Sequence, residues 1–249
     1  MQLVGYSRTP EAGLTVATDG TVEHIPLERG RELAFELGER SCAGAVLDGT
    51  HQPCTSDEVP HCELHTDTWI CARCRGTCLK DEMDCHQPHV VYLAIVAPDH
   101  VKVGVTKAHR IETRLHEQGA DRGVTIHRVK NGRIAREIEA EIGEEVPERI
   151  PISAKIAGIT REVDESAWET VQSSFDVRET YEPEYELAPT SPPIPDTLAT
   201  GRVVGTKGRL VLLELGGSTY VTDLRDLVGH YVSETTAGPE RQTGLGAFS

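Results

Sequence analysis

Residues 62–94 read CELHTDTWICARCRGTCLKDEMDCHQPHVVYLA and hold five of the seven cysteines of the 249-residue chain. Two steps of the metal-binding kind occur within them, Cys62-x2-His65 and Cys71-x2-Cys74. A step of this length lets two ligands reach one tetrahedral ion from a tight turn. The stretch has few aliphatic residues before its end, so it cannot build a core of its own and needs a metal ion to fold. The sequence therefore predicts a zinc-stabilised module.

All seven cysteines together with His65 make eight candidate ligands, enough for two four-coordinate zinc ions. The predicted ligands are Cys71, Cys74, Cys78 and Cys85 for a compact site, and Cys42, Cys54, Cys62 and His65 for a second site. The alternative histidine ligands are His51, His61, His86 and His89. Two closed sites leave no open coordination position, so both zinc ions are expected to be structural rather than catalytic. Disulfides are the weaker alternative, because the number of cysteines is odd and their spacing suits a metal.

The composition bounds the environment of the protein. Its net charge is −15, from 40 acidic and 25 basic residues, and only six of the basic residues are lysine. An acid-rich, lysine-poor surface is typical of a halophile's cytosolic protein, and an ordinary acidic protein is the alternative. No apolar run approaches a membrane span, and the first residues show no basic region followed by an apolar stretch. We therefore expect a soluble, cytoplasmic protein that does not use a membrane.

Local patterns predict both strands and helices, and so an α+β fold. Strands are expected over 14–18, 32–38, 90–96, 101–106, 125–129, 209–215 and 218–222, and helices over 108–118 and 133–145. Turns are expected at Asp19-Gly20 and at Asn131-Gly132. The second helix should bury a stripe of Ile134, Ile138 and Ile142.

Five segments follow from these patterns. They are an N-terminal β segment (1–41), a zinc-binding module (42–89), an αβ core (90–150), an acidic helical segment with a Pro-rich linker (151–198) and a small C-terminal β unit (199–249). The linker assignment rests on residues 161–196, which hold ten acidic residues against two basic ones and end in a cluster of prolines.

The two predicted strands at the start of the core carry a recognisable pair of triplets. Val90-Val91-Tyr92 followed by Lys102-Val103-Gly104 resembles the GIY-YIG nuclease core, in which each triplet ends one of two neighbouring strands. Tyr92 takes the first tyrosine position and Gly104 the glycine position. Lys102 replaces the second tyrosine of the family pattern.

The resemblance covers residues 90–142 and implies a site completed from two helices. Arg114 is the best match for the family's arginine on the next helix, and either Glu137 or Glu139 for the glutamate on the later one. In such a core a tyrosine positions or deprotonates the attacking water, an arginine offsets the charge of the scissile phosphate, and a carboxylate holds Mg²⁺ or Mn²⁺. Because Lys102 replaces a tyrosine and the glutamate is ambiguous, we expect a retired nuclease core used for binding.

Charge along the core supports a nucleic-acid partner. Between residues 97 and 136, nine Lys or Arg stand against four Asp or Glu, a sign opposite to that of the whole chain. The predicted phosphate-facing residues are Lys102, Lys107, Arg110, Arg114 and Arg128. The plain alternative is a solvated helix face.

A second resemblance spans nearly the whole chain. The runs 85–94 and 102–106, Glu117-Gln118-Gly119-Ala120, and a later Gly-x3-Gly-x-Lys-Gly motif over residues 201–208 are similar to the uncharacterised zinc-containing domain-of-unknown-function family 2797. The chain departs from that family at Cys42, which lacks the usual partner cysteine, and at His65, where a second cysteine is common. The resemblance implies an architecture but no activity.

Taken together, these features predict a zinc-containing, intracellular protein that binds DNA or RNA. Two alternatives remain open. One is a non-catalytic scaffold that binds an acidic protein partner, and the other is an active metal-dependent endonuclease. The first discriminating feature is whether Tyr92, Arg114 and one of the two glutamates converge.

Overall fold

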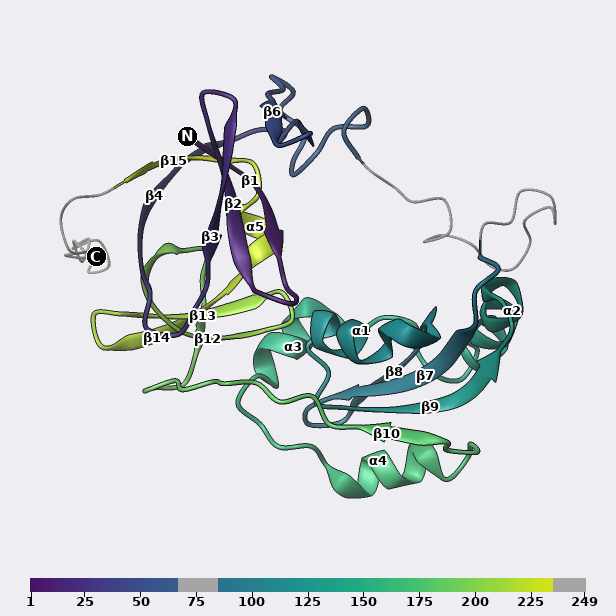
Figure 1. Cartoon of the computed structure of the whole chain (residues 1–249). Helices are drawn as coiled ribbons and strands as arrows, with labels where there is room; N and C mark the ends of the chain where they lie inside the picture. The colour runs from purple at the N-terminus through teal and green to yellow at the C-terminus, as the bar shows by residue number, and fades with distance from the viewer. Residues whose placement is uncertain (67–84, 235–249) are drawn as a thin grey trace, which may run out of the picture.

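The computed structural model describes residues 1–66 and 85–234, which form two lobes that lie side by side (Figure 1). We call them the β lobe and the core lobe. No helix within the described ranges is both long enough and apolar enough to cross a membrane.

The β lobe contains, within the described residues, an eleven-stranded sheet in the order β11-β14-β13-β12-β4-β15-β1-β2-β3-β6-β5. Its strands are β1 (Gln2–Ser7), β2 (Gly13–Thr18), β3 (Thr21–Pro26), β4 (Glu32–Arg40), β5 (Ala45–Leu47), β6 (Thr50–Gln52), β11 (Ile194–Pro195), β12 (Ala199–Lys207), β13 (Leu210–Leu215), β14 (Ser218–Asp223) and β15 (His230–Glu234). The short helix α5 (Leu224–Leu227) follows β14. The expected hairpin at Asp19-Gly20 joins β2 to β3, and both residues have positive φ, as a tight hairpin turn requires.

The N-terminal β segment and the C-terminal β unit, which look separate in the sequence, share this sheet. Strand β15 pairs with both β1 and β4, and β12 pairs with β4. Leucines of β1, β2 and β13 lie in one buried cluster with Phe35 of β4. Pairing between strands so far apart in the chain leaves no local signal, which is why the sequence pattern divides them.

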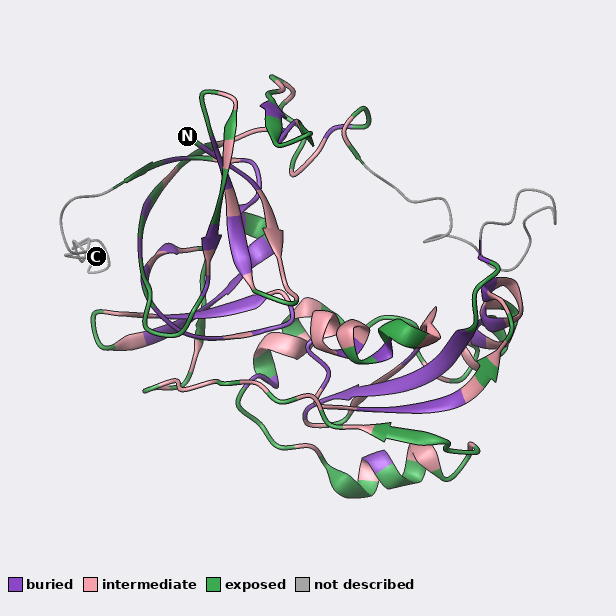
Figure 2. Ribbon diagram, in the orientation of Figure 1, coloured by how far each residue is buried: buried purple, intermediate pink, exposed green. Residues whose placement is uncertain are grey.

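The core lobe is built on a four-stranded antiparallel sheet in the order β10-β9-β7-β8. Its strands are β7 (His89–Val96), β8 (His100–Lys107), β9 (Arg122–Val129) and β10 (Glu179–Tyr181). Strand β7 is buried along its whole length, as Figure 2 shows, because it lies between two strands with helices on both faces. Strand β8 is an edge strand. The apolar run that predicts a buried strand at 90–96 is thereby explained.

Helices cover the two faces of this sheet differently. Helix α1 (Ile111–Gln118), entered through a short 3₁₀ turn (Ala108–Arg110), packs Ile111 and Leu115 on Tyr92 and its neighbours. Helices α2 (Gly132–Ile142) and α4 (Glu165–Gln172) pack on the opposite face. Helix α3 (Ile152–Ala157) packs against the β lobe.

Three expectations for the core region need correction or completion. Asn131-Gly132 is not a turn: Asn131 is the N-cap of α2, and its side chain accepts a hydrogen bond from the backbone N–H of Ile134 at 3.0 Å. The most buried face of α2 carries Ala135 and Glu139, while Ile138 and Ile142 pack at its flank and Ile134 is half-buried. Residues 161–196 hold the expected helix, α4, and also the short strands β10 and β11, which no local pattern indicated.

The lobes meet where the β12–β13 turn approaches the end of α1. Gly208 has φ +59°, and a Cβ there would lie 2.7 Å from the backbone nitrogen of Gly119, which itself has φ +66°. Beside this contact, Lys207 Nζ lies 2.5 Å from Asp121 Oδ1, and the other oxygen of Asp121 accepts the Ala97 N–H. Lys207 and Gly208, the last two residues of the glycine motif over residues 201–208, therefore lie at the junction between the lobes.

Candidate functional site

One candidate metal centre lies at the end of the β lobe. Cys42, Cys54, Cys62 and His65 bring their ligand atoms within 4.8 Å of one another. Cys62 Sγ lies 3.2 Å from His65 Nδ1 and 4.0 Å from Cys54 Sγ, and Cys42 Sγ lies 3.4 Å from His65 Nδ1. Tetrahedral zinc with Zn–S of about 2.3 Å and Zn–N of about 2.0 Å places its ligand atoms about 3.5–3.8 Å apart. The cluster can therefore hold a zinc ion.

The backbone around this centre already supports a thiolate. The N–H groups of Gly44 and Cys62 both donate to Cys42 Sγ, at 3.4 and 3.2 Å. Burial raises the pKa of the Cys42 thiol. Burial also raises the pKa of Cys62, but hydrogen bonds from His65 and Cys42 outweigh it and bring that pKa to about 7. Donors of this kind orient ligands and tune a bound metal.

The alternative histidines lie elsewhere. His51 Nε2 donates to the carbonyl of Ala43 at 2.9 Å, and neither His51 nor His61 belongs to the four-residue cluster. This arrangement favours His65 as the fourth ligand, as the Cys62-x2-His65 step predicts.

Of the compact site only Cys85 can be described, because Cys71, Cys74 and Cys78 lie outside the described residues. Cys85 is buried beside the start of α2. A Cβ on Gly132 would lie 3.1 Å from Cys85 Sγ and 3.0 Å from His89 Nε2. His89 thus lies next to the one ligand of this group that is described, while His86 is exposed.

A second candidate site surrounds Tyr92 in the core lobe. Tyr92 lies opposite Gly104 on β8, and a Cβ on Gly104 would be 2.5 Å from the tyrosine hydroxyl, so the glycine makes room for the ring. The hydroxyl is 2.8 Å from the side-chain amide of Gln118. With the amide oxygen facing this way, Gln118 accepts from the Tyr92 hydroxyl and from Arg114 Nε at 3.0 Å. Burial raises the pKa of Tyr92, although Arg114 and Gln118 oppose the shift.

Lys102 and Glu139 lie in the electrostatic field of the same site. Burial lowers the pKa of Lys102 to about 8, Arg114 adds to the shift, and Glu139 opposes it. Glu139 also disfavours ionisation of Tyr92, as the smallest of the named effects on its pKa. Glu139 is buried and pairs with Arg136 at 2.5 Å, whereas Glu137 is exposed and pairs with Arg133 at 3.2 Å. Of the two predicted glutamates, Glu139 is the one whose charge affects Tyr92 and Lys102, although its helix packs on the opposite face of the sheet from Tyr92.

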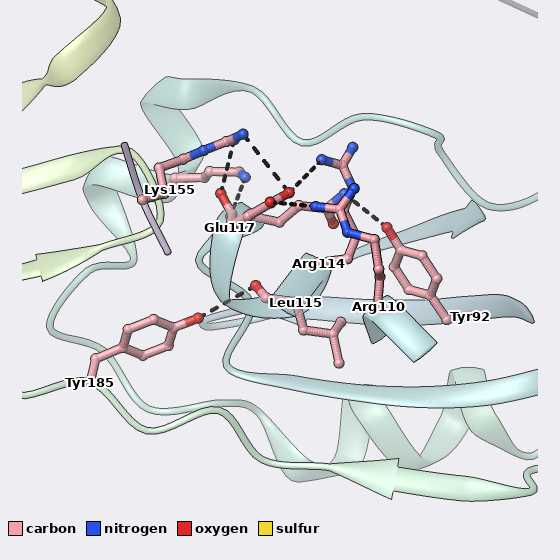
Figure 3. A network of polar contacts seen from close by, with 9 residues as sticks. Tyr92, Arg110, Arg114, Leu115, Glu117, Lys155 and Tyr185 are labelled. Atoms are coloured by element: carbon pink, nitrogen blue, oxygen red, sulfur yellow. Dashed lines mark hydrogen bonds and ion pairs between the residues drawn. The ribbon is translucent and has the colours of Figure 1, made fainter. Parts of the chain in front are cut away.

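Arg114 is held in place by a shared carboxylate. Glu117 pairs with Arg114 at 3.1 Å, with Arg110 at 2.9 Å and with Arg8, from the β lobe, at 3.8 Å (Figure 3). Figure 3 also shows Lys155 of α3 beside this group, and its Nζ donates to the carbonyl of Gln118 at 2.5 Å. Arg114 therefore belongs both to the Tyr92 site and to a cationic group that spans the lobes.

The five predicted phosphate-facing residues do not all share one surface. Lys107 of β8 lies opposite His89 of β7, on the face of the sheet that α2 covers. Arg128 lies opposite Val90, on the face of α1. Lys102, Arg110 and Arg114 also lie on the α1 side, so four of the five residues share that side of the sheet and Lys107 lies on the other.

Four other cationic residues surround Arg114, and three of them have no signal in the sequence. A pocket of about 150 Å³ at the junction between the lobes is lined by Arg8, Arg114, Lys155, Lys207 and Arg209, with Glu117, Gln118 and Gly119. These cations come from the β1–β2 connection, α1, α3 and the β12–β13 turn. Segments so distant in the chain give no local charge pattern. Only Lys207 stood out in the sequence, as part of a glycine motif. We call these five cations the junction cluster.

Comparison with known proteins identifies a family and nothing closer. The family described as "Protein of unknown function (DUF2797)" matches residues 30–191, more than half of the chain. No curated protein and no solved structure matches significantly.

Proposed function

Since the chain belongs to the DUF2797 family, whose description assigns no activity, we propose a function from its geometry: the protein binds nucleic acid through phosphate contacts centred on Arg114. The observation that carries this proposal is the position of Arg114. It is a member of the junction cluster and pairs there with Glu117, and it also lies within hydrogen-bonding range of Gln118 at the Tyr92 site. A group of cations gathered from several segments, in a chain of net charge −15, favours a polyanionic partner.

The electrostatics support one continuous cationic surface. The pKa of Lys155 falls to about 8, first because burial disfavours its charge and then because Lys102, Arg209, Arg114 and Arg8 repel it. Lys102 belongs to the Tyr92 site, so its effect on Lys155 links that site to the pocket. A phosphate backbone passing this surface would relieve repulsion among these cations.

The order of elements supports a GIY-YIG-like core for this function. Tyr92 and Gly104 lie on paired strands, Arg114 on the helix that follows, and Glu139 on the later helix. This is the order that the resemblance implies. We propose that the core binds nucleic acid and does not cleave it. The Tyr92 hydroxyl is buried and hydrogen-bonded, and burial raises its pKa. A phenol in that state is a poor base near neutral pH.

The binding proposal is tested with labelled single-stranded DNA, duplex DNA and RNA, using fluorescence anisotropy across a salt series. We expect affinity to fall as salt rises, and Arg114→Gln to bind several-fold more weakly than the natural protein. Arg29→Gln is the matched control, since Arg29 is exposed on the turn between β3 and β4. Absence of binding to all three nucleic acids at low salt would overturn the proposal.

Active cleavage is the second candidate, favoured by the buried Glu139 carboxylate, whose charge affects the pKa of both Tyr92 and Lys102. A nuclease of this kind would need its carboxylate to hold a divalent ion. Incubation of DNA and RNA with Mg²⁺ or Mn²⁺ tests it, with Glu139→Gln and Glu137→Gln compared. Cleavage that disappears in Glu139→Gln and in Tyr92→Phe, but persists in Glu137→Gln, would establish the nuclease and refute binding alone.

A further inference from the structure

The pocket at the junction between the lobes has a charge that its own side chains do not balance. Among the described residues, its lining holds the five cations of the junction cluster and one carboxylate, Glu117. Two carboxylates outside the lining neutralise two of the cations: Asp121 pairs with Lys207 at 2.5 Å, and Asp223 pairs with Arg209 at 2.7 Å. Glu117 is also shared with Arg110, a cation outside the lining. With Arg110 included, six positive charges stand against three negative ones, so the pocket keeps a positive excess.

The donors in this pocket are also incompletely used. Arg209 Nε is buried and has no hydrogen-bond acceptor among the described residues. Lys155 Nζ donates to the carbonyl of Gln118, a neutral acceptor, and its pKa is lowered to about 8 by burial and by the surrounding cations. Buried donors normally find an acceptor, and an ammonium or guanidinium group binds an anionic acceptor most strongly. The pocket is therefore suited to an anion with several acceptor oxygens.

The size of the pocket limits what that anion can be. Its volume is about 150 Å³. Pockets for whole drug-sized ligands are larger, about 300–1,000 Å³. A pocket of this size suits a group as small as a phosphate. A phosphate monoester carries close to two negative charges at neutral pH, because its second pKa is about 6. Such a dianion offsets more of the positive excess in the pocket than a singly charged anion does.

We propose that this pocket binds a phosphomonoester dianion, held by Lys155, Arg209, Arg8 and Arg114 from both lobes. This deepens the proposed function and rests on it in one respect: the source we expect is the terminal phosphate of a nucleic-acid strand whose backbone follows the surface near Arg114. A free nucleotide offers the same chemistry. An internal phosphodiester carries one negative charge and offsets less of the positive excess. The site thus distinguishes a phosphorylated strand end from a hydroxyl end.

Glu117 acts as a positioning residue for this pocket. It is largely buried, with a side-chain exposure of 12 %, and it pairs with Arg8, Arg110 and Arg114 at once. Three arginines around one carboxylate are drawn into a fixed arrangement, yet only one of their charges is cancelled. Glu117→Gln should therefore weaken phosphate binding even though it removes a negative charge from the lining.

The test compares twelve-nucleotide strands that differ only at one end. Each strand carries a 5′-phosphate, a 3′-phosphate or hydroxyl ends, with the dye at the opposite end, and affinity is measured by anisotropy with the full-length protein. We expect one phosphorylated strand to bind about tenfold more tightly than the hydroxyl strand, since one or more charge-assisted hydrogen bonds are gained. Lys155→Gln and Arg8→Gln should remove this preference, and Arg29→Gln should retain it.

Inorganic phosphate and a nucleoside monophosphate, titrated by calorimetry, separate the two sources. Either ligand should bind the natural protein and not Lys155→Gln. If the small ligand competes with the phosphorylated strand, the pocket takes its phosphate from the strand end. If the small ligand binds without affecting strand affinity, the pocket takes its phosphate from a free nucleotide. Equal affinity for all strand ends, together with no binding of either small ligand, would overturn the pocket while leaving the proposed function intact. Phosphate binding without any strand binding would refute the proposed function and keep the pocket.

Discussion

At the scale of single residues, Lys155 is a half-buried lysine whose positive charge is disfavoured by its surroundings. Four of the cations around it, Lys102, Arg114, Arg8 and Arg209, lower its pKa to about 8, after the larger effect of burial. Lys102 has a pKa of about 8 for similar reasons, whereas the arginines stay charged. A bound phosphate dianion would favour the protonated form of both lysines.

A pH dependence of phosphate binding follows from these values. Because the folded pKa of Lys155 lies near 8, the free protein loses this charge as the pH rises from 7 to 9, and affinity for a nucleoside monophosphate should fall over that range. The phosphate of a nucleoside monophosphate has a second pKa of about 6 and is mostly a dianion over this range, so the protein is the main source of the change. Calorimetric titration at pH 7, 8 and 9 measures the effect. In Lys155→Gln any binding that remains should depend less on pH, with the residual dependence due to Lys102, and an affinity that is constant from pH 7 to 9 would contradict the assignment.

At the scale of elements, the contact between the β12–β13 turn and the end of α1 sets the distance between the two lobes. A Cβ on Gly208 would lie 2.7 Å from the backbone of Gly119, whereas Gly216, in the β13–β14 turn, has nearly the same φ of +58° and nothing nearby. The two glycines thus share a backbone conformation and differ only in their surroundings. They form a matched pair for measuring the lobe contact.

Gly208→Ala should therefore destabilise the protein more than Gly216→Ala. Both variants pay about 1–2 kcal/mol for a left-handed alanine, and Gly208→Ala should add a further cost of about 1–3 kcal/mol because it pushes two backbones apart. Unfolding by urea gives the two free energies. Equal losses in the two variants would mean that the lobes do not depend on this contact.

Elements with a strong local pattern could be predicted from the sequence. The strands around Tyr92 and Gly104 and the helix that carries Arg114 follow from short-range apolar alternation and spacing. The face of α2 could not be predicted in the same way. Its isoleucine stripe suggested burial of Ile134, but packing on the face of the sheet buries Ala135 and Glu139 more deeply. Which side of the helix faces the sheet is set by this packing and not by the stripe alone.

At the scale of the whole molecule, the sequence predicted groups of ligands better than it predicted surfaces. The grouping of Cys42, Cys54, Cys62 and His65 follows from ligand number and chemistry, and the structure brings these four side chains together. The junction cluster could not be predicted, because it exists only once two lobes made from interleaved segments lie against each other. The zinc content and the ligands of the compact site remain predictions.

Zinc should be lost selectively when the described cluster is broken. We expect close to two zinc ions per chain in freshly purified protein, and about one in His65→Gln. His51→Gln is the matched control, since His51 donates to the Ala43 carbonyl and lies outside the cluster. Elemental analysis and the thermal unfolding midpoint report the result. Acidification should release zinc as the thiolates take up protons, and a metal content that is the same in His65→Gln and the natural protein would rule out His65 as a ligand.

The central claim, that this protein binds nucleic acid by phosphate contacts around Arg114, is tested most directly by the slope of log affinity against log salt. Each phosphate contact contributes about 0.9 to this slope for duplex DNA and about 0.7 for a single strand. We predict that Arg114→Gln shows a slope smaller by about one contact than the natural protein, and that Arg29→Gln shows no change. A slope that Arg114→Gln leaves unaltered, in a variant that still unfolds cooperatively, would contradict the account.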